Sequence, residues 1–249
     1  MQDKKTDFGF KNVSISDKTD LVKRVFNNVA SRYDLMNDLM SGGLHRLWKK
    51  QFISHIPRNP GTKLLDVAGG TGDITLAYMD STKDLKTKAT VYDINEAMLE
   101  EGRIKAFDKN NFKNISWECG PAEKLPFKDN SFDVYTVSFG LRNITEKEAA
   151  LAEGYRVLKP GGTLLCLEFS QVDSHTLQKI YDFYSLKVIP LMGKVVANDG
   201  DSYKYLVESI RRFPDQETLK GMIETAGFTN VVYKNLNKGI VAIHQGWKV

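Results

Sequence analysis

The sequence predicts an α/β fold with a doubly wound, mostly parallel sheet of seven strands, and three observations support this prediction. A loop of small residues at 68–72 follows an apolar strand pattern and precedes a helical one. Strand and helix patterns then alternate as far as residue 170, as parallel strands joined by crossover helices require. The chain ends in two consecutive strand patterns, which predict a hairpin and hence an antiparallel strand at one edge.

The strands of the parallel part are short apolar runs bounded by turn residues. They are predicted at 63–67, 89–93, 115–119, 132–138 and 163–167. The hairpin follows, with strands at about 229–235 and 239–244 and a turn at Asn237-Lys238-Gly239. One helix is expected over about 146–157, and another over about 215–226 that ends at Gly227.

Two further segments have helical patterns without strands, and we expect them to cover the sheet. Leu21, Val22, Val25 and Phe26 recur at helical spacing, and Ser41-Gly42-Gly43 marks a turn. We therefore predict one domain, 1–249, made of four parts. They are an N-terminal helical cap (17–56), a cofactor-binding core (61–170), a helical substrate-cap insertion (171–213) and a C-terminal helix with the hairpin (214–249).

Composition excludes several classes of protein. No run of about 18 apolar residues is present, so no membrane-spanning segment is expected, and residues 1–5 lack the apolar stretch of a secretory signal. Cys119 and Cys166 lie in strand patterns, so we expect reduced core residues that form neither a disulfide nor a zinc site.

The charge is unevenly distributed along the chain. The net charge is +4, and residues 1–60 hold eleven Lys/Arg against six Asp/Glu. This bias is too mild to indicate nucleic-acid binding. It suits either a solvated helical face or contact with an anionic membrane. For the membrane contact, the expected residues are Lys18, Lys23, Arg24, Lys49 and Lys50.

The glycine loop limits the choice of ligand. A dinucleotide-binding loop has a third glycine where this chain has Thr75, and a phosphate-binding loop needs a lysine that is missing here. S-adenosylmethionine, which has no phosphate, fits this loop better. The alternative is a tight strand-to-helix turn without a ligand.

Several side chains near the predicted carboxyl ends of the strands suit such a cofactor. Asp93 can accept hydrogen bonds from two ribose hydroxyls, or it can instead cap the next helix. Asp66, Gly69 and Thr71 lie in or beside the loop, where Asp66 can orient the loop or receive an ammonium group and Thr71 can meet the methionine part. The other predicted cofactor-binding residues are Pro121 and Ala122, near the adenine, and Ser138, at the end of the fourth strand.

Arg142 and Asn143 follow directly and form a candidate polar clamp for the oxygens of a methyl acceptor. A phenolate is more nucleophilic at its ring carbons than a phenol, and an arginine stabilises the phenolate charge. The alternative is a loop held by salt bridges. Arginine stays protonated, so the base is sought in Tyr33, Asp34 or His45, although His45 also suits a packed core position.

Two long runs resemble the signatures of one enzyme family. The run at 33–48, YDLMNDLMSGGLHRLW, is similar to the N-terminal signature of the ubiquinone/menaquinone biosynthesis C-methyltransferases, and the run at 156–170 to their second signature. The resemblance extends from about Phe8 to the C-terminus. One departure is Pro121, where the family usually has Asn or Asp, so a side-chain hydrogen bond to adenine is lost there.

The resemblance implies a Rossmann-like class I methyltransferase that transfers a methyl group from S-adenosylmethionine to a ring carbon of a polyprenylated quinol. The implied acceptor is a 2-methoxy-6-polyprenyl-1,4-benzoquinol, demethylmenaquinol, or both, and no metal is expected. A bacterial enzyme would lie in the cytoplasm, with or without contact with the inner membrane, and a eukaryotic one in the mitochondrial matrix. A quinone-biosynthesis assembly and a homodimer are compatible partners. The alternatives are a methyltransferase acting on a sterol or another phenol, and a non-catalytic scaffold that binds the cofactor.

Overall fold

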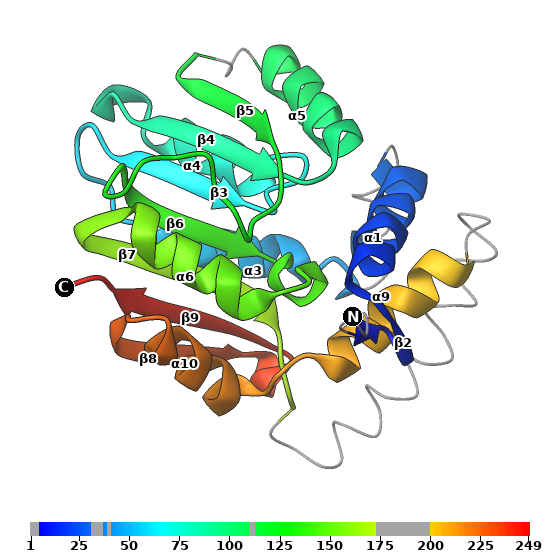
Figure 1. Cartoon of the computed structure of the whole chain (residues 1–249). Helices are drawn as coiled ribbons and strands as arrows, with labels where there is room; N and C mark the ends of the chain where they lie inside the picture. The colour runs from blue at the N-terminus through cyan, green and yellow to red at the C-terminus, as the bar shows by residue number, and fades with distance from the viewer. Residues whose placement is uncertain (1–4, 31–36, 39–40, 110–112, 173–199) are drawn as a thin grey trace.

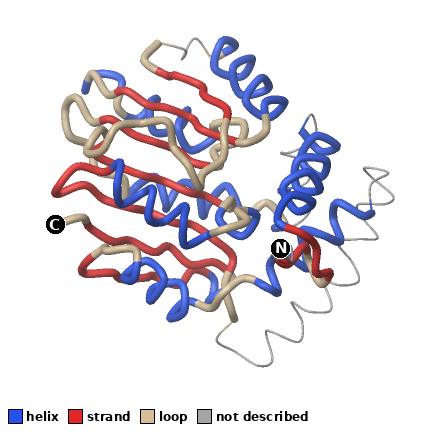
Figure 2. Tube along the Cα trace, in the orientation of Figure 1, coloured by secondary structure: helices blue, strands red, loops and turns tan. Residues whose placement is uncertain are grey.

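The computed structural model describes residues 5–30, 37–38, 41–109, 113–172 and 200–249. A seven-stranded sheet in the order β5-β4-β3-β6-β7-β9-β8 forms the centre (Figures 1 and 2). Its strands are β3 (Lys63–Val67), β4 (Lys88–Asp93), β5 (Ile115–Cys119), β6 (Phe132–Ser138), β7 (Leu158–Phe169), β8 (Thr229–Leu236) and β9 (Val241–Trp247). The described helices are α1 (Ile15–Val29), α3 (His45–Ser54), α4 (Asp73–Ser81), α5 (Glu96–Asp108), α6 (Lys147–Val157), α9 (Gly200–Arg212) and α10 (Gln216–Thr225), with the short turns η2 (Lys83–Leu85), η3 (Leu141–Asn143) and η6 (Asn237–Gly239).

The predicted fold class and strand positions are confirmed. The strands from β3 to β7 pair in parallel, whereas β9 pairs antiparallel with both of its neighbours. The expected antiparallel strand is therefore β9, which lies between β7 and the edge strand β8. Because the chain order reverses between β3 and β6, a crevice is expected at their carboxyl ends.

Two hydrophobic clusters cover the two faces of the sheet. One includes Phe52 of α3 and Tyr78 of α4, and the other includes Leu151 of α6 and Ile223 of α10, all of them fully buried. In Figure 1, α6 and α10 lie in front of the sheet and α3 and α4 behind it. The carboxyl ends of the parallel strands point toward the side of the molecule where α1 and α9 lie (Figure 1).

The N-terminal cap differs from the prediction. Residues 5–14 form a small antiparallel hairpin of β1 (Lys5–Phe8) and β2 (Lys11–Ser14), which the sequence analysis missed. Ser41-Gly42-Gly43 does form a turn, and α3 follows it. The buried side of α3 carries His45, Trp48 and Phe52, whereas Leu44 and Leu47 are exposed.

Other predictions for the outer segments have mixed outcomes. α9 lies within the predicted helical segment 171–213, whose residues 173–199 are outside the described ranges. Gly227 has a φ of +107° just after α10, as expected for a residue that ends a helix.

Cys166 is buried in β7, but Cys119 is exposed at the end of β5, so its assignment to the core was wrong. In the described part of the chain, no helix is long and apolar enough to cross a membrane.

Candidate active site

The site is centred on the loop between β3 and α4 and on the loop after β6. Ala68 and Phe139, at the ends of β3 and β6, both have positive φ values, +50° and +54°. Left-handed backbone is costly for residues other than glycine, so both loops are held in strained conformations. The two loops touch, because a Cβ on Gly140 would lie 2.5 Å from the Cβ of Ala68. Close packing therefore fixes the crevice between β3 and β6.

Asp93 ends β4 beside this loop and orients it. Its carboxylate accepts hydrogen bonds from the backbone N–H groups of Gly70 (2.8 Å) and Asn95 (2.9 Å). Burial raises the pKa of Asp93 to about 6, although these N–H donors favour the charged form. Both sequence interpretations are thus compatible, since the carboxylate joins the loop to the start of α5 and also borders a cavity.

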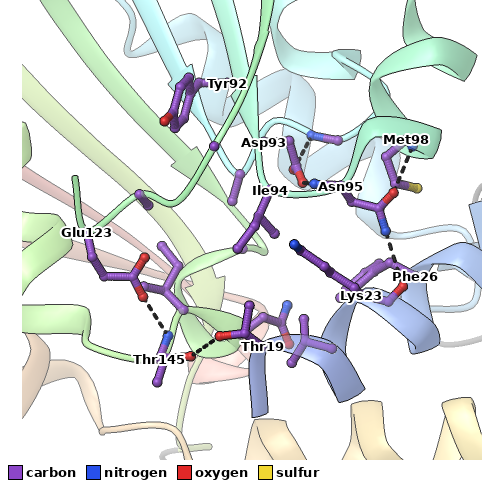
Figure 3. Close-up of a pocket in the computed structure, with 18 of the residues that line it drawn as sticks. Thr19, Lys23, Phe26, Tyr92, Asp93, Ile94, Asn95, Met98, Glu123 and Thr145 are labelled. Carbon is purple, nitrogen blue, oxygen red and sulfur yellow. Dashed lines mark hydrogen bonds between the residues drawn. The ribbon is translucent and has the colours of Figure 1, made fainter. Parts of the chain in front are cut away.

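That pocket, here called the central cavity, encloses about 750 Å³ of space that is partly open to solvent. Asp93, Ile94 and Asn95 lie on one side of it, and Glu123 and Thr145 on another (Figure 3). Of the predicted residues, Ala122 and Asn143 line it, whereas Pro121 does not and is exposed.

Helix α1 forms one wall of the central cavity. Val22, Lys23 and Phe26 contribute to the lining, and the Lys23 side chain extends into the cavity (Figure 3). The Asn95 side chain donates to the Lys23 carbonyl at 3.2 Å, so α1 is held against the start of α5.

These positions correct the predicted set of membrane contacts. Lys18 is 2% exposed and its Nζ lies 3.5 Å from the Ile144 carbonyl, and Lys23 borders the cavity. Lys49 forms an ion pair with Asp73. The apolar residues of the amphipathic helix α1 face the protein interior. Of the five residues predicted to contact a membrane, only Arg24 and Lys50 are exposed.

A second hollow, the loop cleft, adjoins the glycine loop and encloses about 320 Å³ of space that is partly open to solvent. Its lining includes Lys49, Asp66, Gly69, Thr71, Asp73 and Ser138, and it shares Ala68 with the central cavity. Asp66 is buried and accepts hydrogen bonds from the hydroxyls of Thr136 (2.7 Å) and Thr75 (2.8 Å). Burial raises the pKa of Asp66 to about 6.

The two hollows meet at Ala68, which lines both of them. Asp93 and the adjacent backbone suit the ribose and adenine, and the loop cleft suits a small polar group. The Ser138 hydroxyl is buried and has no hydrogen-bond partner among the described residues. Buried polar groups are normally satisfied, so this hydroxyl is suited to a ligand or a water molecule.

Arg142 lies behind the crevice, in a buried ion pair. Its Nη1 donates to Glu168 Oε1 at 2.9 Å and to the Phe139 carbonyl, and Glu168 Oε2 accepts from the Arg142 backbone N–H at 3.2 Å. These contacts match the alternative of an anchored loop. The Nε of Arg142, however, is buried without a partner in the described part of the chain.

Asn143 is oriented by a second buried side chain. The Tyr205 hydroxyl of α9 donates to Asn143 Oδ1 at 3.1 Å, and the Phe8 ring stacks on Tyr205 with centroids 4.1 Å apart. With its oxygen occupied, Asn143 can present its amide N–H groups as donors at the cavity wall.

His45 is held by Asp38. Its Nε2 lies 2.8 Å from Asp38 Oδ1, and hydrogen bonds from Arg46 and His45 lower the pKa of Asp38 to about 2. A carboxylate only accepts, so Nε2 carries the proton and Nδ1, buried without a partner among the described residues, keeps its lone pair. Burial lowers the pKa of His45, which favours this neutral form. Tyr33 and Asp34 lie outside the described residues.

The roles of Glu168, Asp73 and Tyr205 are not predicted from the sequence. For Glu168 a signal was available, because an acid within the apolar run of β7 requires a cationic partner. Lys49 and Asp73 gave no such signal, since they are distant in sequence and meet only in the fold.

Comparisons with known proteins agree over nearly the whole chain. A model described as the ubiE/COQ5 methyltransferase family matches residues 12–248. A ubiquinone/menaquinone biosynthesis C-methyltransferase UbiE of Dinoroseobacter shibae is 56% identical, covering 99% of this chain and 98% of that protein. A mitochondrial 2-methoxy-6-polyprenyl-1,4-benzoquinol methylase of Dictyostelium discoideum is 51% identical, covering 98% and 86%.

Solved structures support the fold. A possible histamine N-methyltransferase of Thermotoga maritima, described as a SAM-dependent methyltransferase, has a TM-score of 0.64 at 22% identity, covering 92% of this chain and all of that one. A SAM-dependent methyltransferase of Aquifex aeolicus has a TM-score of 0.60 at 18% identity, covering 87% and 98%. At such identities the likeness is one of fold, and it confirms the predicted class I methyltransferase architecture.

Proposed function

The chain belongs to the ubiE/COQ5 methyltransferase family, and from that premise we propose that it methylates a ring carbon of a polyprenylated quinol with S-adenosylmethionine as donor. The acceptor would be 2-methoxy-6-polyprenyl-1,4-benzoquinol, demethylmenaquinol, or both. A bond forms between the ring carbon and the methyl group as the sulfonium–methyl bond breaks. S-adenosylhomocysteine leaves, and the ring carbon then loses its proton.

The observation that most supports this chemistry is the buried Nε of Arg142, after β6, which has no hydrogen-bond partner among the described residues. A buried donor without a partner costs about 1–3 kcal/mol, so a ligand oxygen there would be strongly favoured. We propose that this Nε and the Asn143 amide contact the acceptor oxygen. Glu168 holds the guanidinium in place, and positioning supplies much of the rate enhancement.

Of the three candidates for the base, Tyr33, Asp34 and His45, only His45 lies within the described residues. Asp38 fixes its tautomer, and its Nδ1, which has no hydrogen-bond partner in the part of the chain that the structure describes, can accept a proton. We propose His45 as the base, acting directly or through water, and Tyr33 remains a proposed contributor. In the domain scheme proposed from the sequence, residues 17–56 and 171–213 cover the acceptor.

The acceptor is dissolved in a lipid bilayer, so we also propose contact with an anionic membrane through one outer face of the molecule. This face, the α3 face, consists of Leu44, Arg46, Leu47, Lys50 and Arg58, all exposed. Leu47 is 64% exposed and lies between two cationic residues in the sequence of α3, an arrangement suited to a membrane surface. The source organism decides whether this membrane is bacterial or mitochondrial, and a protein assembly remains the alternative route of delivery.

The test is a methyl-transfer assay with labelled S-adenosylmethionine and a reduced short-chain quinol, read by mass spectrometry of the product. Label on a ring carbon supports the proposal, and label on oxygen or only on a sterol contradicts it. A deletion strain that accumulates the demethylated intermediate distinguishes the catalytic function from the alternative of a non-catalytic scaffold. If an Arg142 variant that still binds cofactor clears the accumulated demethylated intermediate, a non-catalytic role is favoured.

A further inference from the structure

The hairpin of β1 and β2 lies against α9, and two contacts hold it there (Figure 1). The Phe8 ring stacks on the ring of Tyr205, with centroids 4.1 Å apart and ring planes 16° apart. In the turn of the hairpin, the Phe10 backbone N–H donates to Glu208 Oε2 at 3.1 Å. Gly9 is buried in this turn with a φ of +58°, and a Cβ there would collide with the Glu208 side chain. Glycine therefore allows the turn to sit directly on one turn of α9.

Tyr205 connects this hairpin to the wall of the central cavity. It is 4% exposed, and its hydroxyl donates to Asn143 Oδ1 at 3.1 Å. Burial raises the pKa of Tyr205, so the hydroxyl keeps its proton at neutral pH and stays available as a donor. The described lining of the cavity includes Asn143 but neither Tyr205 nor Phe8. Tyr205 therefore acts on the cavity through Asn143.

The hydrogen bond from Tyr205 fixes the orientation of the Asn143 amide. An amide has an oxygen that accepts and an NH₂ group that donates, and a half-turn of the side chain exchanges them. The Tyr205 hydroxyl proton occupies Oδ1, which leaves both N–H donors of Asn143 for another partner. Without the hydroxyl, the amide would lose the contact that holds it in this orientation.

We propose that Tyr205 is a positioning residue for methyl transfer, and that the hairpin holds it in place through Phe8. The inference rests on the proposed function, in which the Asn143 amide contacts the acceptor oxygen. It adds that a hairpin outside the cavity affects the turnover of the acceptor. The proposed cofactor contacts at Asp93 and the loop cleft do not involve Tyr205, so the affinity for S-adenosylmethionine should not change.

A double-mutant cycle tests the role of Tyr205, with Tyr205→Phe, Asn143→Ala and the double variant in the methyl-transfer assay. Tyr205→Phe keeps the ring that stacks on Phe8 and removes only the hydroxyl. It should lower kcat by about three- to tenfold, the range for one hydrogen bond between neutral groups, with unchanged cofactor affinity by calorimetry. In the Asn143→Ala background the same substitution should have no further effect, because Tyr205 acts through Asn143. Additive losses, or native kcat in Tyr205→Phe, would overturn the inference.

Two substitutions in the hairpin test its part. Phe8→Leu removes the stacked ring and should lower kcat without weakening the cofactor, and Phe8→Tyr, which keeps a ring, should restore it. Phe10→Leu is the matched control, because Phe10 belongs to the same hairpin but its side chain is 52% exposed. It should keep native kcat. Equal losses of kcat in Phe8→Leu and Phe10→Leu, or a loss of cofactor affinity in Phe8→Leu, would assign the hairpin to the fold alone.

A measurement without turnover separates this inference from the proposed function. The side-chain N–H signals of Asn143 in NMR spectra can be identified by their loss in Asn143→Asp. They should shift in Tyr205→Phe and Phe8→Leu but not in Phe10→Leu. Unchanged signals in Tyr205→Phe would overturn the inference even if the native protein methylates the quinol. A native protein that shows these shifts but transfers no methyl group would count against the proposed function instead.

Discussion

Asp93 illustrates how one side chain serves both the fold and the ligand. Its two backbone donors fix the glycine loop and the start of α5, and burial keeps its pKa near 6. A ribose would bring further hydroxyl donors to the same oxygens. The carboxylate is therefore poised to gain hydrogen bonds when the central cavity is filled.

Asp93→Ala should weaken the binding of S-adenosylmethionine by about 1.5–3 kcal/mol, because hydrogen bonds to a charged acceptor are lost. Calorimetry measures the affinity, and circular dichroism establishes that the variant is folded. Unchanged affinity in a folded variant would remove Asp93 from the cofactor site. Binding of NAD instead would contradict the methyltransferase assignment.

Cofactor affinity should also fall as the pH drops through about 6. Burial raises the pKa values of Asp93 and Asp66 to about 6, and the ligand requires their charged forms. The stability of the ligand-free protein changes with pH in the opposite direction. A raised folded pKa means that protonation stabilises the fold, and this contribution is lost as the pH rises from about 4 to 6. Titrations between pH 5 and 8 should give a shallower affinity profile for Asp93→Asn than for the native protein.

Arg142→Lys keeps the positive charge beside Glu168 but removes the Nε donor. If that donor stabilises the acceptor oxygen in the transition state, kcat should fall by about 10²–10³. The affinity for S-adenosylmethionine should hardly change. Steady-state kinetics and calorimetry on the same preparation separate the two effects. A loss confined to cofactor affinity would reassign this arginine.

At the scale of the elements, the strands of the sheet could be predicted because burial on both faces leaves continuous apolar runs. Leu64 and Leu65 of β3 and Leu164 and Leu165 of β7 are fully buried in this way. The hairpin of β1 and β2 could not, because its eight strand residues are mostly polar and partly exposed. Its stability comes from contacts such as the stacking of Phe8 on Tyr205, which are remote in sequence.

The candidate site was predicted unevenly for the same reason. Residues that follow strands, such as Asp93 and Asn143, could be placed because parallel strands end at one edge. The helices that cover this edge could not be docked from periodicity alone. The sequence therefore assigned Lys18 and Lys49 to solvent or a membrane, although both are used inside the protein.

The burial of Lys18, a residue of α1, gives a test at this scale. Burial, with the charge of Lys147, lowers the pKa of Lys18 to about 8. Because the unfolded chain holds this proton more tightly, the charged form destabilises the fold below pH 8, and stability is regained as the pH rises toward 10.5. Lys18→Met should raise the free energy of unfolding at pH 7 by on the order of 1–3 kcal/mol. Denaturation at pH 7 and 10 measures it, and the gain should shrink at pH 10. A destabilised variant at pH 7 would show that the Lys18 contact with Ile144 outweighs its burial.

For the molecule as a whole, the α3 face would place a membrane, which holds the substrate, close to the active site. The inner side of α3 places Trp48 against Phe139 and Phe169, with ring centroids 6.2 and 6.1 Å away, beside the ends of β6 and β7. Its outer side carries the exposed Leu47 and Lys50. A membrane bound at the outer side would therefore be one helix thickness, about 10 Å, from the acceptor end of the crevice.

Flotation with lipid vesicles tests this arrangement. The native protein should bind vesicles of anionic lipid more than neutral ones, and less as salt rises, because exposed charges are screened beyond about 8–10 Å. Each basic residue contributes about 1 kcal/mol near such a surface, so Lys50→Glu with Arg58→Glu should reduce binding by tenfold or more. Lys88→Glu with Lys113→Glu is the matched control, since these exposed lysines lie at the start of β4 and just before β5, at the opposite end of the strands. Equal recovery of native protein and both variants on anionic and neutral vesicles at every salt concentration would exclude electrostatic docking. Delivery of the quinol by a protein partner would then be the better account.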